Sequence, residues 1–98
     1  MALKFEWDPA KAAHNLKDHG VSFDEATSVF RDPLSSTIAD PDHSHSEGRF
    51  VDLGMSHSGR LLVVSYTERG YIIRIISARD ATRAEQKSYE ETTEKDRR

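Results

Sequence analysis

Residues 60–78 read RLLVVSYTERGYIIRIISA and contain two apolar runs separated by a short polar turn. The runs 60–67 and 71–78 are apolar on both faces, which is typical of central strands in a sheet. Glu68-Arg69-Gly70 between them has the length and the glycine of a hairpin turn. We therefore predict two adjacent antiparallel strands at the centre of a sheet.

Shorter segments on either side complete the predicted sheet. Further strands are expected over residues 3–7, 34–39 and 49–56, with a polar loop over 40–48. Three helix starts are indicated by Asp8-Pro9 and by two capping boxes, Ser22 with Glu25 and Thr82 with Glu85. The expected helices cover residues 9–18, 23–30 and 83–91. The order is β-α-α-β-β-β-β-α, which predicts an α+β fold with a small antiparallel sheet and packed helices.

Length and composition limit the kind of protein. The chain has 98 residues, of which 36% are apolar, so we predict a single domain over residues 1–91 with a modest core. Residues 92–98 are charged and are expected to form a frayed tail. There is no cysteine, no run long enough to cross a membrane and no apolar leader at the N-terminus. We expect a soluble, cytoplasmic protein without a disulfide or a thiolate zinc site.

The overall charge of −3 argues at first against a nucleic-acid partner. The charge is unevenly distributed, however, because residues 1–48 carry a net −5 while residues 49–87 carry a net +3. Six of the seven basic residues in the second segment are arginines, which bind phosphate or carboxylate in a bidentate manner. A basic surface on the sheet is therefore compatible with the acidic total.

Arg74 interrupts an apolar strand, where an unpaired buried guanidinium would be costly. Strict alternation puts Arg74 on one face with Ile72 and Ile76, and Arg79 on the other. Arg74 must then pair with a neighbouring carboxylate or face a groove that receives an anion. Arg49 begins a strand, Arg69 lies in the predicted hairpin turn and Arg79 follows the last strand. Such a set suits phosphate binding if the strand register brings the arginines together.

Other polar residues could have either a structural or a chemical role. Lys11, Asn15 and His19 share the expected polar face of the first helix, and Lys17 with His19 in its last turn suits the helix dipole. His19 could alternatively transfer a proton. The loop segment 42–47, DHSHSE, could hold a divalent metal but is more typical of a solvated loop. The tyrosines are expected to be structural, although each could stack on a base or donate a proton: Tyr66, Tyr71 and Tyr89.

Several ordered segments together resemble one known family. They are residues 5–9 (FEWDP), 15–26 (NLKDHGVSFDEA), 29–33 (VFRDP), 48–50 (GRF), 59–69 (GRLLVVSYTER) and 74–79 (RIISAR). This ordered set is similar to the BrnT family of toxins from bacterial type II toxin–antitoxin systems. The resemblance runs from about residue 5 to residue 90.

The resemblance implies a RelE-like fold and a ribonuclease that inhibits translation. It also implies a BrnA-like ribbon-helix-helix antitoxin as partner, RNA as substrate and operator DNA bound only through the toxin–antitoxin complex. No membrane partner, cofactor or metal is expected. The family positions carried over by the resemblance are Lys17, His19, Arg49, Arg69, Arg74 and Arg79.

A metal-independent ribonuclease needs a base, a cation at the transition state and an acid. We assign the catalytic roles to Arg49 and Arg74 for transition-state charge and to His19 or Lys17 for proton transfer. Arg69 and Arg79 are assigned to binding of the RNA phosphates. Two alternatives remain: a non-enzymatic module that binds a partner through its arginine-rich sheet, and a DNA-binding regulator that acts alone.

Overall fold

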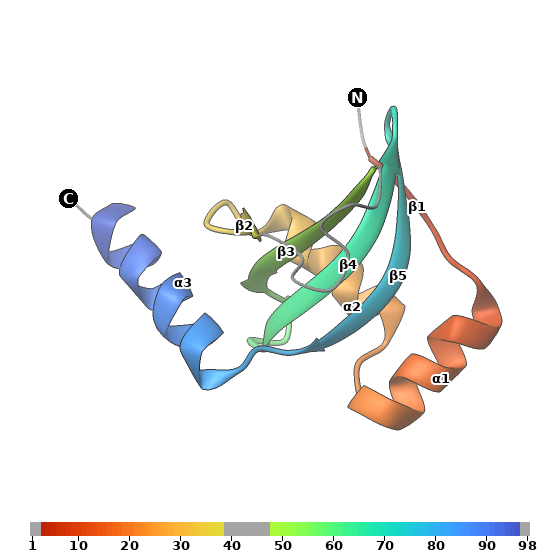
Figure 1. Ribbon diagram of the computed structural model, residues 1–98, viewed down its shortest axis with the longest axis horizontal. Coiled ribbons are helices and arrows are strands. Elements are labelled where there is room, and N and C mark those ends of the chain that lie inside the picture. Colours follow the sequence, from red (N-terminus) through yellow and green to blue (C-terminus); the bar gives the residue numbers. More distant parts are fainter. Residues whose placement is uncertain (1–2, 39–47, 97–98) are drawn as a thin grey trace.

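The computed structural model describes residues 3–38 and 48–96 and contains one sheet flanked by helices (Figure 1). The strands are β1 (Lys4–Glu6), β2 (Ser36–Ile38), β3 (Arg49–Met55), β4 (Leu61–Arg69) and β5 (Ile72–Asp80). The helices are α1 (Pro9–His19), α2 (Phe23–Thr27), a 3-10 turn η1 (Ser28–Arg31) and α3 (Arg83–Asp96). The predicted α+β class and the order of elements are confirmed, with η1 continuing the predicted second helix.

The sheet has five strands in the order β1-β5-β4-β3-β2. Strands β2 to β5 form the predicted antiparallel meander. β1 instead lies parallel to β5, with Phe5 opposite Ile73, so the sheet is mixed and the expectation of a wholly antiparallel sheet is corrected. A parallel pair needs a long connection. Here almost the whole chain lies between the two paired strands, which a local sequence pattern could not reveal.

The helix ends follow the predicted capping signals. The Asp8 carboxylate accepts a hydrogen bond from the backbone N–H of Ala10 at 2.8 Å, and Gly20 ends α1 in the left-handed conformation at φ +68°. The Ser22 hydroxyl accepts from the Glu25 N–H at the start of α2. These contacts lie within a few residues of each other in the chain, which explains why the sequence predicts them.

Each face of the sheet carries its own apolar core. On one face, α1 and α2 cover a cluster centred on the fully buried Leu62, Val64 and Phe23. On the other face, Ala81 from the connection between β5 and α3 and Tyr89 from the middle of α3 pack with Leu53 and Val63. In Figure 1, α1 and α3 lie at opposite ends of the molecule, with the twisted sheet between them.

A β-bulge in β5 changes which side chains share a face. Ser65 is opposite Ser77, but Tyr66 is opposite Ile75, so Ile76 is an extra residue on β5. A bulge of this kind inserts one residue and reverses the alternation beyond it. Arg79, opposite Val63, therefore lies on the same face as Arg74, opposite Thr67. The predicted separation of these two arginines onto different faces is wrong.

The last helix is longer than predicted, and the half-buried carboxylate of Asp32 holds it against the rest of the fold. α3 continues to Asp96, past the expected end at residue 91 and into the predicted tail. The Tyr89 hydroxyl donates to Asp32 Oδ2 at 2.6 Å, and Asp32 also accepts from the N–H groups of Met55 and Leu34.

Within residues 3–38 and 48–96, no helix is long and apolar enough to cross a membrane.

Candidate nucleic-acid interface

Four of the predicted site residues lie on one face of the sheet, the face opposite α1 and α2. The register places Arg49 opposite Thr67, Thr67 opposite Arg74, and Arg74 opposite Glu6. The next row contains Arg69, Ile72 and Lys4. Residues directly opposite each other project from the same face, and adjacent rows on that face are about 7 Å apart. We call the six polar members of these two rows the basic face: Lys4, Glu6, Arg49, Thr67, Arg69 and Arg74.

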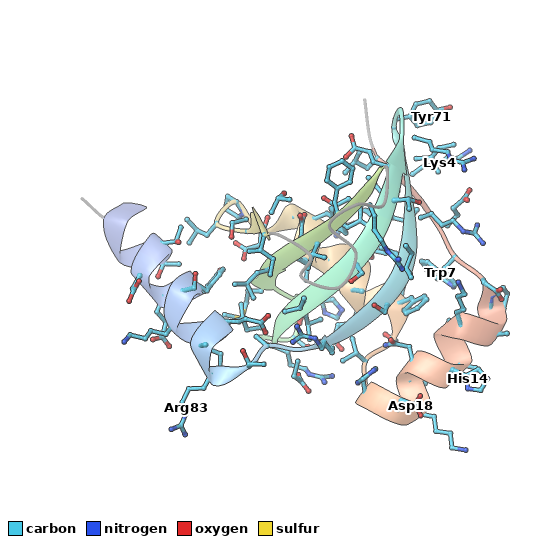
Figure 2. All side chains as sticks on the ribbon, viewed as in Figure 1. Lys4, Trp7, His14, Asp18, Tyr71 and Arg83 are labelled. Carbon is cyan, nitrogen blue, oxygen red and sulfur yellow. The ribbon has the colours of Figure 1, made fainter. Side chains whose placement is uncertain are left out.

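The basic face carries four cations and one carboxylate at the hairpin end of the sheet. Figure 2 shows Lys4 and Tyr71 at this end, where the β4–β5 turn lies. Arg69 is the last residue of β4 and is not in the turn as predicted, because Gly70 and Tyr71 form the connection and Arg69 still pairs with Ile72. Its side chain therefore belongs to the strand face and joins the other arginines.

Arg74 forms an ion pair with a residue that the sequence interpretation did not single out. Its Nη1 lies 2.8 Å from Glu6 Oε2, and each side chain is 50% exposed. The pair lies in a pocket of about 220 Å³ that is lined by Glu6, Thr67, Arg69, Ile72 and Arg74. Of the two predicted alternatives for Arg74, the pairing with a carboxylate is confirmed, and both side chains also line a pocket and remain accessible to a ligand.

Arg49 lies at the start of β3 at the other end of the row. The residue is half-buried, and its Nε is buried with no hydrogen-bond partner among the described residues. A buried guanidinium donor without a partner costs free energy unless an acceptor arrives. This donor and the pocket around Arg74 flank Thr67 from its two sides.

Arg79 shares the face but serves a different contact. Its guanidinium binds both oxygens of Glu85, at 2.8 and 3.0 Å, and so ties β5 to the first turn of α3. Arg79 lies four β4 positions from the Arg74 row, a separation of about 13 Å along the strands. The two arginines therefore face the same side but do not contact one small ligand together.

The ion pair between Arg79 and Glu85 shifts the pKa of both groups. The hydrogen bonds from Arg79 outweigh the effect of burial and, together with the Thr82 N–H, lower the pKa of Glu85 to about 2. The same hydrogen bonds raise the pKa of Arg79. Since the folded state lowers the pKa of Glu85 below its ordinary value of 4.5, this carboxylate stabilises the fold above that pH. Its contribution is lost as the pH falls from about 4.5 towards about 2.

Glu85→Gln is expected to lower the free energy of unfolding at pH 7 by about 1 kcal/mol, because it weakens a partly exposed ion pair and a helix cap. The difference from the unsubstituted chain should shrink on acidification below pH 4.5 and vanish near pH 2. Urea unfolding across this pH range measures the difference in free energy of unfolding, and Glu91→Gln, at an exposed position, is the control. A pH-independent difference would contradict the role of the Glu85 charge.

His19 and Lys17 lie far from the basic face. Both are exposed at the C-terminal end of α1, which packs on the other face of the sheet. This end of α1 is near the C-terminal end of β5, because Asn15 bonds to Ala78 and the Gly20 carbonyl accepts from Arg60. Arg74 and the end of β5 are roughly 20 Å apart at the usual rise per strand residue. The structure does not bring His19 or Lys17 together with the arginines.

The three tyrosines have different surroundings. Tyr66 and Tyr89 are buried, and their hydroxyls donate to Asp52 and Asp32. Burial and the bond to Asp32 raise the pKa of Tyr89 to about 12, which suits a structural hydroxyl. Tyr71 is 50% exposed in the hairpin turn beside the basic face. Tyr71 is thus the tyrosine placed to stack on a base.

The acidic residue Glu25 has a structural role at the β3–β4 turn. Glu25 accepts from Ser56, Ser58 and Arg60, and burial of its carboxylate is outweighed by these groups, so its pKa is lowered. This cluster holds the β3–β4 turn against α2. The possible metal ligands of the segment 42–47 lie outside the described residues. Within those residues, no group of three or more His, Cys, Asp or Glu side chains is arranged to hold a metal.

Lys4, Glu6 and Thr67 are the members of the basic face that the sequence analysis did not identify. Lys4 and Glu6 alternate with apolar residues on β1, and Thr67 stands in the polar end of β4, so each is typical of an ordinary solvent-facing residue. The parallel pairing of β1 with β5 brings Glu6 beside Arg74, across 68 positions of sequence. The available signal was the short alternating strand at residues 3–7, which fixed the face of Glu6 relative to Phe5 but not its neighbour.

Comparison with known proteins identifies the fold and the family. The crystal structure of the Brucella abortus ribonuclease toxin BrnT superimposes with a TM-score of 0.65 at 19% identity, covering 84% of this chain and 100% of that chain. No curated protein sequence matches. A family model described as the ribonuclease toxin BrnT of type II toxin–antitoxin systems matches residues 7–85, which include most of the sheet and α1 and α2. The chain therefore belongs to the BrnT family of ribonuclease toxins.

Proposed function

We propose that the basic face is the surface on which this toxin binds and cleaves RNA. The observation that carries the proposal is the row of Arg49, Thr67 and Arg74 on three adjacent strands, with Arg69 in the next row. Planar guanidinium groups bind phosphate oxygens in a bidentate manner, and several of them along a face can follow an RNA backbone. The exposed Tyr71 beside them offers a ring on which a base can stack.

The proposed reaction is cleavage by attack of the RNA 2′-hydroxyl on the adjacent phosphate. Arg74 and Arg49 stabilise the charge that develops on the phosphorane, since both can reach a phosphate placed over Thr67. Arg69 binds a neighbouring phosphate, and Arg79 binds one farther along the backbone only if its pair with Glu85 opens. Proton transfer by His19 or Lys17 stays a prediction from the sequence resemblance, and no contact with the basic face supports it.

The biological role follows the family. Cleavage of cellular RNA would inhibit translation, and a BrnA-like ribbon-helix-helix antitoxin would neutralise the toxin in the cytoplasm. The complex of toxin and antitoxin, rather than the toxin alone, would bind operator DNA. The net charge of −3 agrees with a toxin that binds RNA but does not bind operator DNA alone. The basic face is local and is suited to one strand of RNA.

Cleavage of a defined RNA by the purified chain, freed of any partner, tests the proposal. We expect fragments that end in a 2′,3′-cyclic phosphate and begin with a 5′-hydroxyl, formed equally well with a chelator present. The cyclic ends are the signature of attack by the 2′-hydroxyl. An absence of cleavage, with or without added divalent metal, would favour the non-enzymatic binding module instead.

Arg49→Ala is expected to weaken binding of a non-cleavable 2′-deoxy RNA analogue about 10-fold and to reduce its dependence on salt. Three arginine–phosphate contacts to a single strand give a slope of log K against log salt of about −2, and loss of one contact lowers its magnitude by about 0.7. Fluorescence anisotropy at several salt concentrations measures the slope. The exposed Arg83→Ala on α3 is the control, and an equal change in both variants would exclude a specific role for Arg49.

A further inference from the structure

The pocket beside Arg74 contains one carboxylate, the side chain of Glu6. Among the other described residues that line it, Arg69 and Arg74 carry guanidinium groups, which only donate hydrogen bonds, Thr67 offers a neutral hydroxyl and Ile72 is apolar. Glu6 is the remaining polar member, and as a carboxylate it is an acceptor. Its Oε2 lies 2.8 Å from Arg74 Nη1, with the side chain 50% exposed.

The position of Glu6 is poorly explained by fold stability or by RNA binding. A half-exposed ion pair of this kind contributes little to the free energy of unfolding. A carboxylate among four cations also repels the phosphates that those cations attract. Its negative charge therefore weakens phosphate binding by the basic face. Its carboxylate, however, is the proton acceptor that the other described residues of the pocket do not provide.

We propose that Glu6 is the general base of RNA cleavage, an inference that rests on the proposed function of the basic face. The Glu6 carboxylate takes the proton of the 2′-hydroxyl, and the 2′-oxygen forms a bond to phosphorus. The bond from phosphorus to the 5′-oxygen then breaks. The 5′-oxygen leaves with the electron pair and takes a proton from solvent, and Glu6 later releases its proton to solvent. The products are a 2′,3′-cyclic phosphate and a 5′-hydroxyl.

The contact with Arg74 gives the carboxylate a defined place next to the reacting phosphate. Arg74 uses Nη1 for Glu6, and its other guanidinium nitrogens have no partner among the described residues. One guanidinium can therefore hold the base and a phosphate oxygen at the same time. Proton acceptor and phosphate are then neighbours, as a general base within hydrogen-bond reach requires.

Glu6→Gln separates this role from a structural one, because glutamine is nearly isosteric and its amide oxygen still accepts from Arg74. We expect single-turnover cleavage to fall about 100-fold or more, since general-base catalysis contributes roughly 10²–10⁴. Affinity for the non-cleavable 2′-deoxy analogue should stay the same or rise, because a negative charge is removed. Glu68→Gln is the matched control: it removes an exposed carboxylate from the same end of β4 on the opposite face, and cleavage should not change.

A second variant tests the proton transfer itself. Glu6→Asp keeps a titratable carboxylate, so slower cleavage should still fall at acidic pH, whereas the residual cleavage of Glu6→Gln should lose this acid limb. Cleavage by Glu6→Gln within 3-fold of the unsubstituted chain would overturn the inference and leave the proposed function intact. Parallel loss of cleavage and RNA affinity would also overturn it, because Glu6 would then act only by positioning Arg74. An unsubstituted chain that cleaves no RNA would overturn the proposed function as well.

Discussion

Asn15→Ala is expected to destabilise the fold by about 3–4 kcal/mol, the largest effect on stability that we predict for a polar side chain. Asn15 is 6% exposed, and its side-chain amide makes three hydrogen bonds. Nδ2 donates to the carbonyls of Val21 and Ala78, and Oδ1 accepts from the Ala78 N–H at 3.1 Å. Alanine leaves all three backbone groups without these partners in the interior.

The location of Asn15 explains the size of the effect. β1 covers the outer edge of β5 only from Ile72 to Arg74, so Ala78 lies on a part of that edge with no strand beside it. The Asn15 amide replaces the missing strand by pairing with both backbone groups of Ala78. It also holds the chain after α1, through Val21, in the correct place for α2 to begin.

Thermal or urea unfolding followed by circular dichroism measures the destabilisation. A loss of 3–4 kcal/mol corresponds to a decrease in Tm of roughly 15–25 °C for a domain of this size. Lys11→Ala, one turn earlier on α1 and exposed, is the control and should change stability by less than about 0.5 kcal/mol. If Asn15→Ala unfolds at the same temperature as Lys11→Ala, the three hydrogen bonds do not have the assigned role.

Arg74→Ala is expected to reduce RNA cleavage about 1000-fold, the largest effect on activity. Loss of a group that stabilises transition-state charge costs roughly 10²–10³ in rate, and arginines at transferring phosphates reach higher values. Folding should be almost unaffected, because the ion pair with Glu6 is half-exposed on both sides and is worth at most about 1 kcal/mol. Loss of activity with retained stability separates a functional arginine from a structural one.

Two further variants make the assay specific. Arg74→Lys keeps the charge but not the planar fork, so it should recover only part of the activity. Arg83→Ala removes an exposed arginine from α3, far from the hairpin end of the sheet in Figure 2, and should cleave normally. Arg74→Ala that cleaves within 3-fold of the unsubstituted chain would exclude the basic face as the site.

The same assay on His19→Ala and Lys17→Ala decides the role of α1. Because α1 packs on the opposite face, the geometry predicts that these variants cleave almost normally when the RNA lies on the basic face. A loss as large as that of Arg74→Ala would mean that proton transfer takes place at the end of α1. The basic face would then bind RNA without cleaving it.

Much of the secondary structure could be predicted because its causes are local. The caps at Asp8, Ser22 and Thr82 use hydrogen bonds between residues two or three positions apart. The apolar runs of β4 and β5 indicate central strands directly, because a strand buried on both faces has no polar alternation. The family resemblance added the expected ribonuclease activity, and the match over residues 7–85 confirms the family.

Contacts between residues far apart in the chain could not be predicted from local sequence patterns. Asn15 lies on the predicted polar face of α1, but it is buried and its partner Ala78 is 63 residues away. The bulge at Ile76 depends on how β5 fits against β4, and one added residue moves Arg79 to the face of Arg74. A one-residue change in register exchanges the two faces of a strand, so no alternation pattern could settle this point.

The sequence by itself determined which segments become strands and helices, because caps, turns and hydrophobic periodicity act within a few residues. It also supplied the arginines. The tertiary structure decided which arginines act together, and it added Glu6 to them through the parallel pairing of the first strand with the last. The physical reason is that a binding face is a property of register across strands, and register is set by packing between residues far apart in the chain.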